Sequence, residues 1–289
     1  MSNRINKVLK GMPASDGAGV NLTRALGQPA LKYIDPFLML DEIKSDDPND
    51  YIAGFPPHPH RGFETLTYLM HGSMEHNDST GGHGLINSGG VQYMTAGKGI
   101  IHSETPKQDQ GLLWGFQLWI NLPSTEKMVD ASYVDIERTD IPTLNLNNQE
   151  DGKITSAQVK LIAGKFNNSD ETGPVKRDDI DLQIYDLTNA EKSALPIKID
   201  TDAQGYLYVY QGSVEAEGKT INETHIAEIS TTSEQDESSI KLTMAENTGV
   251  LLAVAKPIGE PIVQYGPFVM NTAEEIETAL RDYQSGRLA

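Results

Sequence analysis

The chain of 289 residues contains no cysteine. This excludes disulfide bonds, thiolate metal ligands and thiol nucleophiles. Any metal that the protein binds must therefore be held by nitrogen and oxygen atoms. No apolar run approaches the about 20 residues that a membrane-spanning helix needs. The first residues, MSNRINKVLKGMP, also lack the apolar core of a secretory signal. These absences together predict a cytoplasmic protein that makes no membrane contact.

Basic residues are scarce as well. Lysine and arginine number 23 against 41 acidic residues, which gives a formal net charge of −18. A field of this sign repels nucleic acids and anionic membrane surfaces. The composition therefore argues against direct binding to DNA or RNA, and its simplest consequence is solubility.

Turn-forming residues are plentiful, and they divide the chain into short pieces that read as strands. The 26 glycines and 15 prolines are spread along the whole sequence. Segment 111–122 alternates apolar and polar residues, segment 205–218 reads as two strands joined at Gln211-Gly212, and segment 248–257 reads as a buried strand. This rhythm predicts an all-β fold of the sandwich or barrel type.

One helix is expected, near the end of the chain. Segment 271–286 begins with Thr272 and has Glu275 three residues later, which is the pattern of a capping box. Apolar residues then recur on one face, and Gly286 supplies the stop signal. The sequence therefore predicts a short amphipathic helix that packs across a sheet.

The length and a central polar stretch predict two domains, with boundaries at 1–135 and 146–289. The two halves share a pattern. Segments 68–78 and 208–218 both read aromatic-x-x-x-Gly-Ser-x-Glu, as though one hairpin occurs twice. Histidines accompany this hairpin only in the first half. The single histidine of the second half, His225, has no partner histidine there. We therefore expect the second domain, which ends in the helix, to be metal-free.

The stretch FPPHPHRGFETLTYLMHG (55–72) places two of the seven histidines, His58 and His60, on either side of Pro59. In an extended segment, residues two apart point to the same face. Proline is compatible with this geometry at a strand start or on an edge strand. The spacing therefore predicts a pair of imidazoles that can clamp one metal ion.

A second pair, His102 and Glu104, follows in GGVQYMTAGKGIIHSETP (89–106). The 41 residues between His60 and His102 are enough for a pair of strands to lead away and return alongside. Two such pairs facing each other would supply three nitrogens and one oxygen. That donor set suits one divalent ion of iron, manganese, nickel, cobalt, copper or zinc. In an octahedral ion it leaves two positions open.

The other candidates are weaker. If the strand continues past His60, Glu64 shares its face and either orients a histidine or serves as a fifth ligand, although an ordinary salt bridge is the competing interpretation. His71, His76 and His83 are expected to be surface or loop residues, and of the three His76 is best placed to face the mouth of the site.

Four segments together resemble the pirin family of the cupin superfamily: HPHRGFETLTY, GGVQYMTAGKGIIHSE, DPFLMLDEI (35–43) and GPFVMNTAEEIETALRDYQSG (266–286). The resemblance implies two cupin barrels, which are double-stranded β-helices of the jelly-roll type, followed by a short C-terminal helix. It also implies a single metal ion, usually iron, in the first barrel. The ligands fall by motif on His58, His60, His102 and Glu104.

The same resemblance implies a quercetin 2,3-dioxygenase-like enzyme that acts with oxygen on flavonol-like aromatic substrates. In that activity Glu104, or Glu64 nearby, would accept the proton of the substrate hydroxyl. The alternative is an iron-dependent redox sensor that binds transcription factors or metabolic enzymes without turnover. Oxygen consumption coupled to loss of substrate separates the two.

Overall fold

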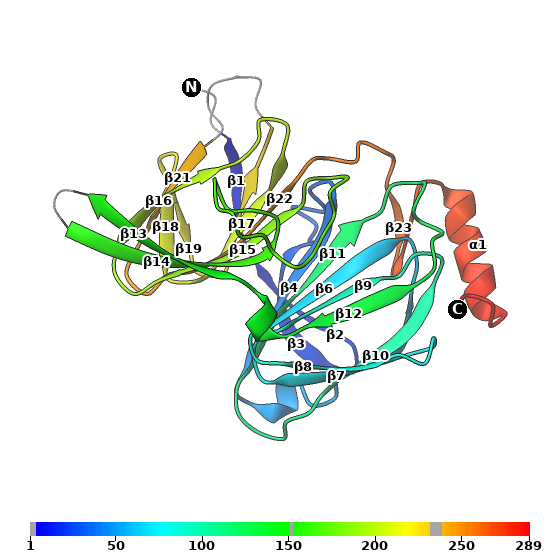
Figure 1. Cartoon of the computed structure of the whole chain (residues 1–289). Helices are drawn as coiled ribbons and strands as arrows, with labels where there is room; N and C mark the ends of the chain where they lie inside the picture. The colour runs from blue at the N-terminus through cyan, green and yellow to red at the C-terminus, as the bar shows by residue number, and fades with distance from the viewer. Residues whose placement is uncertain (1–3, 151–152, 232–238) are drawn as a thin grey trace. The chain divides into compact units, whose positions relative to one another are not determined.

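The computed structural model describes residues 4–150, 153–231 and 239–289, and its regular secondary structure is almost entirely β-strand (Figure 1). The chain forms two compact units. The first unit comprises Met12–Gly27, Pro36–Arg138 and Ile258–Ala289, and the second comprises Met1–Gly11, Gln28–Asp35 and Thr139–Pro257. The expected all-β fold with two cupin units and a short C-terminal helix is confirmed.

The first unit is a sandwich of two antiparallel sheets. The strands of its larger sheet are β2 (Met12–Asp16), β3 (Val20–Leu26), β4 (Phe37–Ser45), β6 (Phe63–His71), β9 (Val91–Thr95), β11 (Leu113–Asn121) and β12 (Ser132–Ile136), in the order β12-β9-β6-β11-β4-β3-β2. Those of its smaller sheet are β5 (Phe55–His60), β7 (Ser73–Asp78), β8 (His83–Asn87) and β10 (Ile100–Pro106), in the order β5-β10-β7-β8. The unit also contains the hairpin β23 (Val263–Tyr265) and β24 (Phe268–Met270), the helix α1 (Ala273–Gln284) and a 3-10 turn, η1 (Pro48–Asp50).

The second unit repeats this plan. Its larger sheet contains β1 (Ile5–Lys10), β13 (Thr143–Glu150), β14 (Lys153–Ala163), β15 (Gln183–Asn189), β17 (Gln204–Gln211), β20 (His225–Ile229) and β22 (Gly249–Ala255), in the order β1-β20-β17-β22-β15-β14-β13. Its smaller sheet contains β16 (Ser193–Lys198), β18 (Ser213–Ala216), β19 (Lys219–Asn222) and β21 (Ser239–Met244), in the order β16-β21-β18-β19. The turn η2 (Arg138–Asp140) lies where the chain passes between the units.

The repeated hairpin predicted from the sequence is the corner where the chain changes sheets. β6 and β7 meet at Gly72, and β17 and β18 meet at Gly212. Both glycines have positive φ, 100° and 73°, a conformation that other residues adopt only with strain. A Cβ at either position would also lie within 2.6 Å of a neighbouring side-chain oxygen. The shared Gly-Ser pattern therefore marks the same corner in both units.

The strands and the helix predicted from the sequence are present. In β11, Leu118 and Ile120 are fully buried, as the alternation indicates, and β22 is buried along its whole length. In α1, Thr272 is the N-cap and exchanges both hydrogen bonds of the capping box with Glu275. The buried face of the helix packs with β24 in an apolar cluster of Phe268, Met270, Ile276, Ala279 and Leu288.

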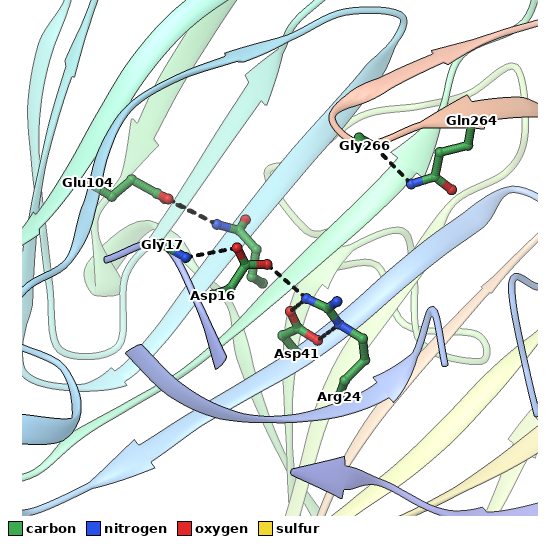
Figure 2. Close-up of polar contacts among 8 residues, drawn as sticks. Asp16, Gly17, Arg24, Asp41, Glu104, Gln264 and Gly266 are labelled. Atoms are coloured by element: carbon green, nitrogen blue, oxygen red, sulfur yellow. Dashed lines mark hydrogen bonds and ion pairs between the residues drawn. The ribbon is translucent and has the colours of Figure 1, made fainter. Parts of the chain in front are cut away.

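The outer strands of the larger sheet in the first unit are linked by one guanidinium. Arg24 of β3 donates from Nε and Nη2 to the two carboxylate oxygens of Asp41 on β4, at 2.9 and 2.7 Å (Figure 2). The same Nη2 also donates to Asp16 of β2 at 3.0 Å. The Asp41 side chain is buried, so this paired geometry compensates the loss of its hydration.

The C-terminal segment is bound to the turn that follows β5. Arg61 N donates to Pro267 O at 3.2 Å, and Val269 N donates to Arg61 O at 3.0 Å. The Arg61 guanidinium reaches Asp282 on α1 at 2.9 Å. Gly62 has a φ of 86°, and a Cβ there would lie 2.0 Å from Val269 O. The chain therefore returns from the second unit to complete the first.

These contacts differ from the boundaries expected from the sequence. Residues 258–289 were assigned with the second domain, 146–289, but their contacts group them with the first unit. At the other end, Met1–Gly11 belongs to the second unit, because β1 pairs with β20. The physical reason is backbone pairing between segments far apart in the sequence, which local composition does not reveal.

Among the described residues, no helix has the length and apolar character needed to cross a membrane.

Candidate metal centre

Three histidines gather on the smaller sheet of the first unit. β5 and β10 are antiparallel neighbours whose register places His102 opposite His58 and Ile100 opposite His60. The ring centroids lie 4.4 Å apart for His58 and His102, 4.8 Å for His60 and His102, and 4.7 Å for His58 and His60. One ligand atom from each residue lies within 4.8 Å of the others. The predicted imidazole cluster is therefore formed.

The position of β5 explains how the His-Pro-His spacing is accommodated. β5 is the edge strand of its sheet, and among the described strands it pairs with β10 alone, so the missing N–H of Pro59 removes no hydrogen bond on the free side. The route between the two pairs differs from the expectation. Four strands, β6 to β9, intervene rather than two. The chain leaves the smaller sheet for the larger one twice, at β6 and at β9, and returns each time, so that β10 lies alongside β5.

The hydrogen bonds of the three rings leave nitrogens available for a metal ion. His58 Nδ1 lies 2.9 Å from Pro56 O. A carbonyl can only accept, so Nδ1 carries the proton and Nε2 keeps a free lone pair. Within the described part of the chain, His102 Nε2 and His60 Nδ1 are buried without a hydrogen-bond partner. Buried imidazole nitrogens without partners are costly unless something binds them, so the cluster fits a metal ion.

Electrostatics favours the neutral, ligating form of the two buried rings. Burial holds the pKa of His60 well below its ordinary value, and the nearby His58 lowers it further. Burial is also the largest cause of the strongly lowered pKa of His102, followed by its histidine neighbours. Both rings are therefore uncharged at neutral pH, as metal binding requires.

These shifts predict an acid-dependent loss of stability in the metal-free protein. The unfolded chain protonates both imidazoles near pH 6.5, whereas the folded protein resists protonation. Their contribution is complete above about pH 6.5 and is lost as the pH falls toward the depressed folded pKa values. At pH 5.5, one unit below the unfolded pKa, we expect a loss of up to about 1 kcal/mol per histidine. Urea unfolding at pH 7.5 and 5.5 measures it. The loss should be smaller in His60→Gln, and an equal loss in both proteins would contradict the assignment.

The predicted carboxylate, Glu104, is buried two residues beyond His102 on β10, but it does not belong to the group of ligand atoms that the histidines form. Its Oε1 accepts a hydrogen bond from Gln117 Nε2 at 3.1 Å. The single proton of the Thr67 hydroxyl is shared between this oxygen, 3.4 Å from Oγ1, and Gln117 Oε1, 3.1 Å from Oγ1. Gln117 and Thr67 belong to the larger sheet and were not singled out from the sequence. The structure therefore places a held carboxylate beside the cluster, and ligation by Glu104 remains a proposal.

Glu64 lies elsewhere, so the argument that placed it with His60 is wrong. β5 ends at His60, and after Arg61 and Gly62 the chain begins β6 in the other sheet. Because side chains alternate along a strand, Glu64 faces the opposite side of β6 from Thr67, which contacts Glu104. Glu64 instead accepts a hydrogen bond from Thr95 Oγ1 at 2.9 Å.

The expectation that His76 is a surface residue is also wrong. Its side chain is fully buried on β7, and its Nδ1 lies 3.2 Å from His102 Nδ1. His71 and His83 are exposed, as expected. A usable signal was present in the sequence. His76 is two residues after Met74 in the repeated hairpin, so both face inward, and Ala216 occupies the matching position in the second copy.

The second unit fills the same positions with apolar side chains. With the two Gly-Ser corners aligned, the strand registers place Ile197 and Ile240 where the first unit has His58 and His102. Leu242 and Ala216 likewise stand where it has Glu104 and His76. All four belong to the hydrophobic core of the second unit. Apolar side chains offer no ligand at these four positions.

The fold and the histidine cluster define a bicupin, a protein of two cupin units, of which the first is capable of binding a metal ion. The chain belongs to the pirin family. The family's Pirin model matches residues 19–120, and its model for the pirin C-terminal cupin domain matches residues 184–289.

Known proteins resemble the chain over its whole length. A Pseudomonas aeruginosa protein with the provisional name quercetin 2,3-dioxygenase is 47% identical over 281 residues, covering 96% of this chain and 95% of its own. A pirin-like protein of Caulobacter vibrioides is 42% identical over 281 residues, covering 97% of each chain. The crystal structure of a quercetin 2,3-dioxygenase from Acinetobacter baumannii superposes with a TM-score of 0.87 at 28% identity, covering 100% of this chain and 99% of that one.

Proposed function

We propose that the protein is a metal-dependent dioxygenase that cleaves flavonol-like aromatic substrates with oxygen. The observation that carries the proposal is the cluster of His58, His60 and His102, whose ligand atoms lie within 4.8 Å of one another beside the buried Glu104. The names of two similar proteins, one 47% identical and one with a matching structure, point to the same activity.

Iron is the metal we propose, with Glu104 as a fourth ligand in addition to the three imidazoles. Nitrogen and oxygen donors accept most divalent first-row ions, so the choice needs a measurement. Elemental analysis of protein purified without added metal tests it. When bound, such an ion supplies a Lewis acid and a place where substrate and oxygen can meet.

Residues around the cluster hold Glu104 and the His60 imidazole in position. Glu104 is positioned to accept the proton of the substrate hydroxyl, because Gln117 and Thr67 hold its Oε1 in place. Phe63 and Trp119 pack against His60 at centroid distances of 5.1 and 5.3 Å. These rings fix the orientation of the imidazole and keep water away from one side of the cluster.

The experiment that tests the function uses quercetin as the probe. The protein is loaded anaerobically with ferrous ion, mixed with quercetin and then exposed to oxygen. We expect the flavonol absorbance to decay with equimolar uptake of oxygen and release of carbon monoxide, and we expect neither in chelator-treated protein. The absence of metal-dependent decay would contradict the proposal. Capture of a protein partner that depends on the metal's redox state, without oxygen uptake, would support the regulatory alternative.

Replacing Glu104 by glutamine is expected to lower kcat for quercetin by about 10²–10⁴-fold, because glutamine cannot accept the proton. Steady-state oxygen uptake at saturating quercetin, together with metal content, measures it. Glu64→Gln is the matched control and should leave turnover unchanged, because Glu64 faces away from Thr67 and Glu104. Equal losses in the two variants would contradict the role given to Glu104.

A further inference from the structure

His76 connects the metal cluster to a buried carboxylate. β7 pairs with β10 on the side opposite to β5, in a register that places Asp78 opposite His102 and His76 opposite Glu104. His76 Nδ1 lies 3.2 Å from His102 Nδ1, and His76 Nε2 lies 3.1 Å from Asp78 Oδ2. The side chains of His76 and Asp78 are both fully buried. The three groups therefore form one hydrogen-bonded row that ends at the cluster.

The proton positions in this row follow from the ionisation state of Asp78, which lies at the end of the row away from the cluster. Asp78 Oδ1 accepts from Thr80 N at 2.7 Å, from Thr80 Oγ1 at 2.6 Å and from Gly82 N at 3.1 Å. Burial raises the pKa of Asp78, but these bonds together with the one to His76 outweigh it and lower the pKa. Asp78 is therefore an ionised carboxylate that only accepts hydrogen bonds.

An acceptor at Asp78 fixes every proton between it and the cluster. His76 Nε2 must donate to Oδ2, so the Nδ1 of a neutral His76 ring is an acceptor. His102 Nδ1 must then donate to it, which leaves His102 Nε2 without a proton. That nitrogen is the one that lies buried without a hydrogen-bond partner among the described residues, and its lone pair is available to a metal.

We propose that His76, held by Asp78, is a positioning residue that locks His102 in the tautomer whose Nε2 can bind the metal ion. The inference rests on the proposed metal site and is independent of the dioxygenase activity. His58 is held in one tautomer by a backbone carbonyl, Pro56 O. His76 has the corresponding role for His102. Metal-ligating histidines commonly depend on such a partner for their orientation and basicity.

Two further observations support the role of His76 and Asp78 as partners of His102. Gly82 leaves the room that the carboxylate occupies, because a Cβ there would lie 2.3 Å from both Asp78 Oδ2 and a ring carbon of Tyr133. The second unit lacks both the ligand and its partner, with Ile240 in place of His102 and Ala216 in place of His76. The first unit thus has both the ligand His102 and its partner His76, and the second unit has neither.

Asp78→Asn is the sharpest test, because the new amide is the same size but can fit in only one way. Three donors converge on Oδ1, so the asparagine oxygen must occupy that position and its NH₂ must face His76 Nε2. His76 then donates from Nδ1, His102 accepts at Nδ1, and the proton moves to His102 Nε2, where it blocks the metal. We expect zinc affinity to fall by about 10–100-fold, measured by competition with a chelator.

The tautomer itself is read by ¹⁵N NMR of the metal-free, full-length chain with labelled histidine. In the wild-type protein His102 should carry its proton on Nδ1, and in Asp78→Asn on Nε2. Glu75→Gln is the matched control. It removes the carboxylate partner of another histidine on the same hairpin, His83, at 3.3 Å on the surface, and it should change neither quantity.

The results separate this inference from the metal site itself. Wild-type protein that binds no zinc would overturn the site. Asp78→Asn with unchanged affinity, or with weaker binding but the wild-type tautomer, would overturn the positioning role. If Asp78→Asn does not fold, His76→Phe replaces it. That variant should give a mixture of His102 tautomers and weaker zinc binding, and a single wild-type tautomer with unchanged affinity would contradict the inference.

Discussion

Replacing His102 by alanine is expected to lower the affinity for a divalent ion by more than about 100-fold, beyond the loss typical of removing a partner of a ligand. His102 lies on β10, between the strand that carries His58 and the strand that carries Asp78. Its Nε2 is buried without a hydrogen-bond partner among the described residues, so the substitution removes one of the three imidazole nitrogens that are available to the ion. Zinc competition and the metal content of the purified protein both measure the effect.

His83→Ala is the control for this prediction. His83 lies on the same sheet, but its side chain is 63% exposed and pairs with Glu75 on the surface. The control should retain one ion per chain and the wild-type affinity. A His102→Ala protein that remains folded and still binds the ion as tightly as the wild type would contradict the assignment of the cluster.

Replacing Lys127 by alanine is expected to destabilise the protein by several kcal/mol, at about 1–3 kcal/mol for each buried acceptor that it leaves unsatisfied. The Lys127 side chain is buried in the first unit, and burial lowers its pKa to about 8. Its Nζ donates to Gly62 O at 2.8 Å, Asn121 Oδ1 at 2.7 Å and Val269 O at 3.0 Å. The substitution leaves three buried acceptors without this donor, and each such loss is costly. Chemical unfolding measures the change.

Lys127 also secures the site, because Gly62 follows shortly after His60 and Val269 belongs to the C-terminal hairpin. The control is Lys98→Ala. Lys98 makes a surface ion pair with Asp130, with side-chain exposures of 52% and 87%, and pairs of this kind contribute at most about 1 kcal/mol. Equal stability losses in the two variants would contradict the role of the buried amine as a link between three segments.

The residues of the cluster were predictable because their signals are local. The spacing of His58 and His60 specifies one face of an extended strand, and Pro59 specifies an edge. The Gly-Ser corner repeats at Gly72 and Gly212 because both corners need a positive φ. The capping box of α1 is likewise a local signal, because its two residues, Thr272 and Glu275, lie within four consecutive positions.

The predictions for Glu64 and for residues 258–289 were wrong for a common physical reason. Both depend on contacts with segments that are far away in the sequence. Glu64 was placed with His60 by counting along a strand that ends between them, at the turn that Gly62 makes against Val269 O. The assignment of residues 258–289 missed the hydrogen bonds of Arg61 with Pro267 and Val269. Neither contact leaves a periodic trace in the sequence.

The position of His76 was predictable in part, because one of its features is local and the other depends on a distant strand. Its inward orientation could have been inferred from the repeated hairpin, in which Met74 and His76 match Val214 and Ala216. Its partner could not, because the contact with His102 depends on the register between β7 and β10, across 26 residues of chain. A pattern within one strand predicts which side chains point inward but not which side chain of another strand they meet.

The central claim is that His58, His60 and His102 hold one metal ion in the first unit. Anomalous diffraction from crystals of the zinc-loaded protein, collected on both sides of the zinc absorption edge, tests it most directly. We expect one strong peak per chain at the cluster, about 2.0–2.1 Å from one nitrogen of each ring. A cluster without a peak, or a zinc ion bound only elsewhere in the chain, would contradict the claim.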